Sequence, residues 1–134
     1  AALPTAVLTG PDYWGYDRSA FASAASAFTT KTDPARAKQL LAEAKPAKPI
    51  VIGIQGSSAV HEQTANVIQA AGKALGLDIR IKVIPVEQYG NLYSDPKARA
   101  GLDAFLTTFY GNVADPLDVY AVFAAGGPSN YGGY

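Results

Sequence analysis

The clearest candidates for chemistry in this sequence are two carboxylates three positions apart, Asp115 and Asp118. Carboxylates at this spacing can share one face of a helix and act as an acid/base pair. Asp115 stands directly before Pro116, however, and an aspartate followed by proline is typical of a helix N-cap and first turn. Asp118 then lies in that turn, where its charge interacts favourably with the helix dipole. We therefore interpret the pair as a helix start.

His61 is the single histidine of the chain and follows Ser58 by three residues. A catalytic triad or a zinc site built on it would need partners that its neighbours do not supply at helical spacing. We therefore expect His61 to be a solvent-exposed residue in the first turn of a helix. The sequence predicts no metal site around it.

A glycine-containing turn at 53–58 has the strand-then-helix context of an anion-binding loop. It lacks the lysine of a phosphate-binding loop and has one glycine too few for a dinucleotide fingerprint. Its backbone N–H groups remain able to hold a carboxylate. There is no Gly-x-Ser-x-Gly nucleophile elbow and no cysteine. The sequence thus predicts no catalytic acid/base constellation in this stretch, and an enzyme domain whose catalytic residues lie elsewhere stays a third hypothesis.

Composition narrows the classes of partner. The 134 residues carry 11 basic and 11 acidic side chains, with no basic stripe of the kind that binds nucleic acid. No run of about 18 apolar residues is long enough to span a bilayer. The chain contains no methionine and begins without a charged and apolar leader. We expect it to be a piece of a longer polypeptide.

The elements that must position these residues alternate between helices and strands. The expected order is a helix at 33–44, a strand at 50–54, a helix at 59–75, a strand at 78–86, short helices within 87–100, a central buried strand at 104–110 and a helix from Asp115. Strands separated by helices imply parallel pairing with right-handed crossovers. The sequence therefore predicts a small three-layer α/β unit, a mainly parallel sheet flanked by helices.

The domain organisation follows from the same pattern. Residues 1–32 are expected to be an irregular entry segment, 33–125 an α/β core and 126–134 a C-terminal loop. Within the long helix, the residues expected to face the core are Val60, Thr64, Val67, Ile68, Ala71 and Leu75. Trp14, in an aromatic-rich part of the entry segment, fits both a cover over the core edge and a ligand-facing aromatic.

Several segments occur in the order typical of one protein family. They are Asp33–Ala44, Ile50–Ile54, Ala65–Gln69, Leu75–Ile79, Asp103–Leu106, Tyr110, Asp115-Pro116, Phe123 and Asn130-Tyr131. Together they resemble solute-binding protein family 5, the peptide, nickel and oligosaccharide binding class of ABC importers. The resemblance implies a lobe of a type II periplasmic-binding-protein fold, in which two lobes close on a ligand. This chain would be most of the C-terminal lobe.

The resemblance also implies a binding protein that uses no cofactor and is not an enzyme, and it implies partners and a location. The partners would be a peptide or other small-molecule ligand, the missing N-terminal lobe of the same protein and an ABC permease in the membrane, with no nucleic acid. The location would be extracytoplasmic, in the periplasm or anchored to the cell surface as a lipoprotein. An alternative is the effector-binding domain of a transcriptional regulator, which can share the same lobe topology.

The candidate ligand-binding residues are Phe109, Tyr110, Asn112 and Trp14. In peptide-binding members of the family, an aspartate in the loop before the Asp-Pro helix pairs with the α-ammonium of the ligand. Asn112 stands at that position here and brings no charge, which would cost about tenfold in affinity for a free amine. An uncharged ligand such as a sugar, or a peptide held by backbone contacts, is therefore comparably expected. Asn112 also fits a turn residue that tolerates positive φ.

Overall fold

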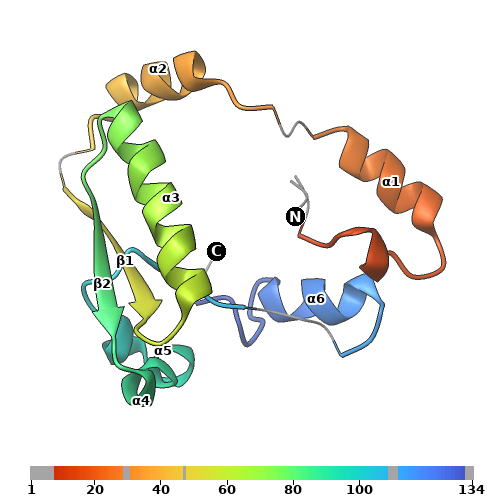
Figure 1. Ribbon diagram of the computed structural model, residues 1–134. Helices are drawn as coiled ribbons and strands as arrows, with labels where there is room; N and C mark the ends of the chain where they lie inside the picture. Colours follow the sequence, from red (N-terminus) through yellow and green to blue (C-terminus); the bar gives the residue numbers. More distant parts are fainter. Residues whose placement is uncertain (1–7, 29–30, 47, 109–111, 132–134) are drawn as a thin grey trace. The chain divides into compact units, whose positions relative to one another are not determined.

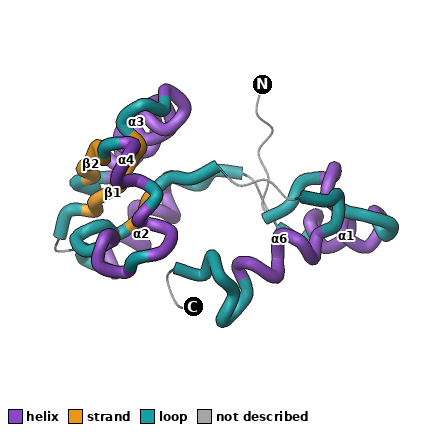
Figure 2. Tube along the Cα trace, turned by 90° about the horizontal axis from the view of Figure 1, so that it is seen from below, coloured by secondary structure: helices purple, strands orange, loops and turns teal. Residues whose placement is uncertain are grey.

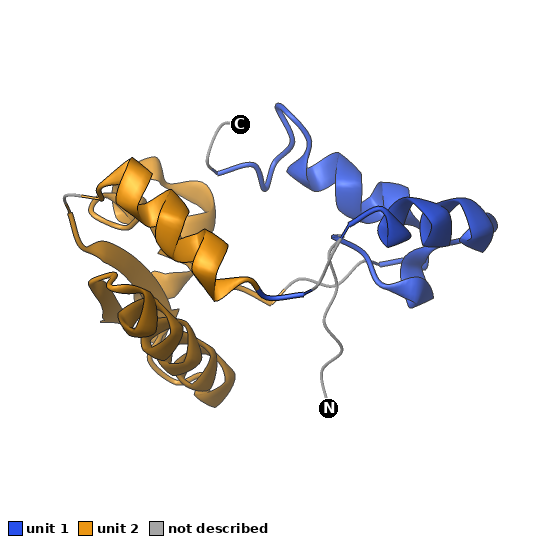
Figure 3. Ribbon diagram, turned by 90° about the horizontal axis from the view of Figure 1, so that it is seen from above, with its two compact units in different colours: residues 1–32, 109–134 blue, residues 33–108 orange. Residues whose placement is uncertain are grey.

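The computed structural model describes residues 8–28, 31–46, 48–108 and 112–131. The chain divides into two compact units, coloured separately in Figure 3. Unit 1 combines Ala1–Thr32 with Phe109–Tyr134, and unit 2 is Asp33–Thr108. Within the described residues, no helix has both the length and the apolar character that crossing a membrane requires.

Unit 2 is built on a parallel sheet of three strands (Figure 1). Strand β1 (Ile50–Gln55) lies between β2 (Ile79–Ile84) and β3 (Ala104–Phe105). The long helix α3 (Ala59–Leu75) connects β1 to β2, which is how parallel neighbours must be joined. The predicted parallel α/β class is thus confirmed.

The prediction of a central buried strand at 104–110 is wrong. Strand β3 has two residues and pairs with β1 alone, so that β1 is the central strand of the described sheet. Residues 106–108 are not in a strand, and 109–110 lie outside the described residues. A physical reason lies at Leu106, whose N–H still donates to Gly53 but whose carbonyl accepts from the hydroxyl of Tyr89. The hydroxyl of Tyr89 thus donates to a carbonyl that the N–H of a neighbouring strand would otherwise bind.

The helix ends follow the local sequence signals. Helix α2 (Pro34–Ala44) begins at Asp33, whose carboxylate accepts from the N–H of Arg36 at 2.8 Å. Ser58 caps α3 in the same way through the N–H of His61 at 3.2 Å. Gly76 ends α3 with φ of 87°, and the next N–H folds back to Gly72. These caps confirm the predicted bounds of both helices.

The face by which α3 packs on the sheet agrees only in part with the prediction, since Ile68 packs against the core as expected but other predicted residues do not. Val60 and Val67, expected to face the core, are 66% and 70% exposed, whereas His61, Ala65 and Gly72 are buried. A Cβ built on Gly72 would lie only 2.3 Å from Cδ1 of Ile79. At Gly72 the helix therefore approaches β2 so closely that only glycine fits, while His61 and Ala65 are buried on the same helix.

Helices cover both faces of the sheet and produce three layers. On one face α3 packs against a cluster made of Ile52, Ile54, Ala65 and Ile79. On the other, α4 (Val86–Tyr89), α5 (Asn91–Ser94) and η2 (Pro96–Arg99) supply a second cluster with Ile84, Tyr89 and Leu92 at its centre. Gly53 lies beneath this second layer, since a Cβ there would meet Leu102 Cδ1 at 3.0 Å.

Unit 1 is formed by helices and loops from the two ends of the described chain (Figure 2). It contains η1 (Pro11–Tyr13) and α1 (Arg18–Ser26) from the segment expected to be irregular, and α6 (Pro116–Phe123). After α6 the backbone turns back, and the N–H of Ser129 donates to the carbonyl of Val122 at 2.9 Å. A Cβ on Gly127 would lie 2.6 Å from that same carbonyl oxygen, so this turn requires glycine.

Candidate functional site

A hollow in unit 1 brings together two regions that sequence reasoning singled out separately. It is lined by Trp14 and by the start of α6, and its volume is about 390 Å³. The complete lining is Trp14, Gly15, Tyr16, Asp17, Phe21, Asp115, Pro116, Leu117 and Tyr120. Four of these residues are aromatic and two carry carboxylates, so the hollow combines flat apolar surface with negative charge.

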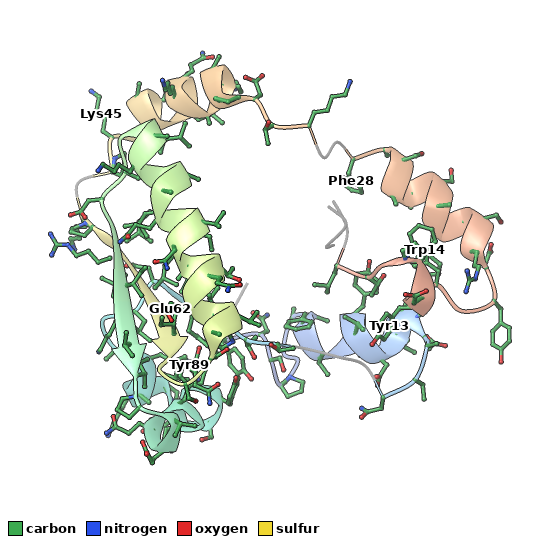
Figure 4. All side chains as sticks on the ribbon, viewed as in Figure 1. Tyr13, Trp14, Phe28, Lys45, Glu62 and Tyr89 are labelled. Carbon is green, nitrogen blue, oxygen red and sulfur yellow. The ribbon has the colours of Figure 1, made fainter. Side chains whose placement is uncertain are left out.

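Trp14 is held in the wall of this hollow by its indole nitrogen. Nε1 donates to the carbonyl of Thr9 at 3.1 Å, and the hydroxyl of Thr9 donates to the hydroxyl of Tyr120 at 3.5 Å. Thr9 itself is buried. Figure 4 shows Trp14 just beyond η1. Because its N–H is used inside the protein, the indole can offer a solute only its ring surface.

The chain turns sharply after Trp14, and this turn brings the segment around Trp14 against α6. Gly15 has φ of 55°, a left-handed conformation that favours glycine. A Cβ at Gly15 would lie 3.6 Å from Cδ of Pro116, so the turn packs directly on the first residue of α6. Pro116 is buried there. One special backbone conformation thus sets Trp14 beside α6.

The two carboxylates of the hollow also begin helices. Oδ1 of Asp17 accepts from the N–H of Ala20 at 3.1 Å and from the hydroxyl of Ser19 at 2.9 Å. These two bonds, the backbone one first, hold the pKa of Asp17 below its ordinary value. Oδ1 of Asp115 accepts from the N–H of Leu117 at 2.8 Å, which confirms its predicted role as helix cap. No lysine, arginine or histidine is among the lining residues.

Asn112 does not line the hollow. It is exposed, and its backbone N–H donates to Oδ2 of Asp118 at 2.6 Å. Asp118 therefore does more than favour the dipole of α6, because it also ties the preceding loop to the helix. The two other candidates, Phe109 and Tyr110, lie outside the described residues.

Of the residues that line the hollow, the sequence analysis named only Trp14 as a ligand contact. Asp17 and Tyr120 carried no motif, and Tyr120 joins the site only because α6 packs on the opposite end of the described chain. Phe21 and Tyr16 were visible as part of an aromatic-rich segment, without any sign of what they face. The cap pattern of Asp17 with Ser19 two residues later was the one local signal available.

The prediction that His61 is solvent-exposed is wrong. Its side chain is 6% exposed and its Nδ1 accepts from the N–H of Gln55 at 3.2 Å. Its ring centroid lies 5.7 Å from that of Tyr89, near the start of α3 (Figure 4). An Nδ1 that accepts leaves the proton of the neutral ring on Nε2. His61 is thus a structural link between β1 and α3.

Aromatic residues beside His61 form a cluster whose hydroxyl groups make hydrogen bonds within the protein. Tyr89 donates to the carbonyl of Leu106, and the hydroxyls of Tyr93 and Thr107 lie 2.9 Å apart. Burial, followed by the nearby Tyr93, raises the pKa of Tyr89 to about 12. These contacts serve packing at the carboxyl end of the sheet.

The turn at 53–58 is not arranged as a carboxylate cradle. The N–H of Gln55 is taken by His61, that of Gly56 by the carbonyl of Ile84 at 2.9 Å, and that of Ser58 by the carbonyl of Gln55 at 3.1 Å. Across the part of the chain that the structure describes, no group of three or more His, Cys, Asp or Glu side chains could hold a metal ion. The hollow of unit 1 is therefore the better candidate site.

Comparison with known families identifies the chain. The profile described as bacterial extracellular solute-binding proteins, family 5 middle region, matches residues 1–131. Searches of curated proteins and of solved structures found no match. The profile covers nearly the whole sequence, including both units and the hollow between Trp14 and α6. The chain therefore belongs to the family 5 bacterial extracellular solute-binding proteins.

Proposed function

We propose that this chain is part of an extracytoplasmic protein that captures a small solute for an ABC importer, and that the hollow of unit 1 contacts the solute. The family is one of binding proteins for such importers. The observation that carries the proposal is that Trp14 and the start of α6 line one hollow. A tryptophan face is a large, rigid contact surface of the kind that solute sites use.

The proposed solute is a peptide or another oligomeric or uncharged ligand. Asn112 supports the uncharged alternative, because the resemblance to peptide-binding members of the family would put its neutral amide at the position of the carboxylate that pairs with the α-ammonium group. Asp118 is not expected to bind the α-ammonium group in place of that carboxylate, since its Oδ2 already accepts from the N–H of Asn112. Phe109, Tyr110 and Asn112 remain proposed ligand contacts beside Trp14.

The proposed partners are a second lobe of the same protein and an ABC permease. Large apolar side chains on unit 2 support the need for a covering surface, since Val83 on β2 and Leu40 on α2 are exposed along with Val60 and Val67. Exposed apolar side chains mark a partner surface where they form one contiguous patch. The proposed location is the periplasm or the outer face of the cell membrane, where a lipid anchor would hold the protein.

Native mass spectrometry of the protein purified from its host tests the proposal. We expect a small solute to co-purify with the native protein. In a Trp14→Leu variant, the fraction of protein that carries this solute should be about tenfold lower. Phe28→Leu is the matched control, because Phe28 is an exposed aromatic of unit 1 that does not line the hollow. A solute retained equally by Trp14→Leu would contradict the role of the hollow.

A further inference from the structure

We infer that the hollow of unit 1 binds the positively charged end of the solute, an alkylammonium or guanidinium group on an apolar stem such as a lysine or arginine side chain. This inference rests on the proposed function and, of the solutes proposed there, selects a peptide with a basic side chain over an uncharged ligand. It depends on which side chains line the hollow and on how their hydrogen bonds are already used.

Charge is the first argument. The hollow contains Asp17 and Asp115 and no basic side chain. Each carboxylate caps a helix, and each helix N-terminus carries about half a positive charge, which offsets roughly half of the formal charge of the pair. About one net negative charge remains, which suits one cationic group and disfavours an anion.

The remaining acceptor capacity of these carboxylates is the second argument. The hydrogen bonds described for Asp17 and Asp115 all reach Oδ1. An ionised carboxylate has about four acceptor positions, so Oδ2 of each remains able to accept from a solute. The hydrogen bonds from the N–H of Ala20 and the hydroxyl of Ser19 favour the ionised form of Asp17 and lower its pKa.

The aromatic lining is the third argument. The rings of Trp14, Phe21 and Tyr120 line the hollow, whereas Tyr16 lies at its rim and is fully exposed. A cation within about 6 Å of an aromatic face is attracted by the ring quadrupole. Since the indole N–H of Trp14 already donates to Thr9, its ring surface is what a solute meets. Pro116 and Leu117 add apolar contact for a methylene stem. Aromatic faces with carboxylates form the combination that recognises organic cations.

The single tryptophan of the chain allows a direct test. We propose to titrate the 134-residue chain with the capped tripeptides Ac-Ala-Lys-Ala-NH2 and Ac-Ala-norleucine-Ala-NH2 while recording the emission of Trp14. The two probes differ chiefly in the ammonium group. We expect half-saturation by the lysine peptide at a concentration about fivefold lower, as an exposed cation–π contact and exposed ion pairs allow.

A double variant, Asp17→Asn with Asp115→Asn, separates charge from folding, since asparagine is as good a helix cap as aspartate. We expect the preference for the lysine peptide to disappear in it. Asp33→Asn is the matched control, because Asp33 caps α2 in unit 2 and does not line the hollow; it should keep the preference. Raising the salt concentration from 0.1 M to 1 M should also reduce the preference, since screening shortens from about 10 Å to about 3 Å.

The outcomes distinguish this inference from the function on which it rests. Equal affinity of the unaltered chain for the two peptides, or a preference that survives the double variant, would overturn the cationic specificity. The proposed capture of a solute at Trp14 would still stand if the co-purified solute depends on Trp14. A purified protein that carries no solute and a Trp14 emission that responds to neither peptide would overturn both.

Discussion

The N–H of Gln55, at the carboxyl end of β1, donates to Nδ1 of His61 in the first turn of α3 at 3.2 Å. The bond joins the last residue of the central strand to the helix that covers it. The imidazole that accepts this bond also packs on Tyr89. The link fixes the rotation of α3 about its axis.

Replacing His61 with alanine should lower the free energy of unfolding by about 2–4 kcal/mol, because it removes a buried ring and leaves the Gln55 N–H without its acceptor. Urea denaturation followed by circular dichroism measures this. The neighbouring substitution Val60→Ala should change stability by about 0.5 kcal/mol or less, since Val60 is exposed. A larger cost for Val60→Ala than for His61→Ala would mean that α3 packs by its other face.

Gly72→Ala should destabilise the protein by about 1–2 kcal/mol even though alanine favours helices, because the new Cβ would meet Ile79 at 2.3 Å. In an Ile79→Ala background the same change should become stabilising, since the clashing atoms are gone. This double-mutant cycle is read by chemical denaturation.

Gly90 offers the control for this cycle. It has φ of −58° and nothing lies within 4 Å of a Cβ built there, so Gly90→Ala should stabilise by about 0.4–1 kcal/mol. If Gly72→Ala were also stabilising in the unaltered protein, the close approach of α3 to β2 would be refuted.

Asp118→Ala should release the loop before α6, because Oδ2 of Asp118 accepts from the N–H of Asn112. Hydrogen exchange measured by NMR should show the Asn112 amide exchanging about tenfold faster, as loss of a charge-assisted hydrogen bond allows. The Leu117 amide, bound to Asp115, serves as internal reference and should change little. An unchanged exchange rate of the Asn112 amide would contradict the hydrogen bond to Asp118.

Stability should fall as the pH is raised from about 10 to about 12, because the pKa of Tyr89 is about 12 in the folded protein against 10.0 in its ordinary state. The folded state favours the neutral hydroxyl, so the stabilisation is complete below pH 10 and is lost as the pH approaches the raised value. Urea unfolding across this range measures it. Tyr89→Phe should flatten the dependence, and Tyr16→Phe, at an exposed position, should not.

Local signals predicted the helix limits, because a cap is decided within a few residues. Asp33, Ser58 and Asp115 each bond an N–H two or three residues ahead, and the sequence contains everything that these bonds need. The packing face of α3 depends instead on Ile79, which lies beyond the end of the helix and requires Gly72 beneath it. Apolar periodicity alone favoured Val60 and Val67, which are exposed.

In the candidate site, too, some features follow from the local sequence and others from contacts between distant segments. Trp14 was visible in the sequence as a possible ligand contact, but the hollow around it forms only because Gly15 packs on Pro116, far along the chain. Strand β3 ends early for a comparable reason, since Tyr89 reaches the Leu106 carbonyl from another element. Contacts between distant segments decide both features, and no local pattern encodes them.

The position of β2 at one side of the described sheet has a consequence for solubility. An outer strand offers backbone groups to which a strand of another molecule can add, and this is a common route to aggregation. Along β2, the charged side chains of Arg80 and Lys82 alternate with apolar ones, and both are exposed. A second copy aligned in register would bring like charges together in a row. The strand thereby resists self-templated polymerisation while Ile79, Ile81 and Ile84 still serve the core.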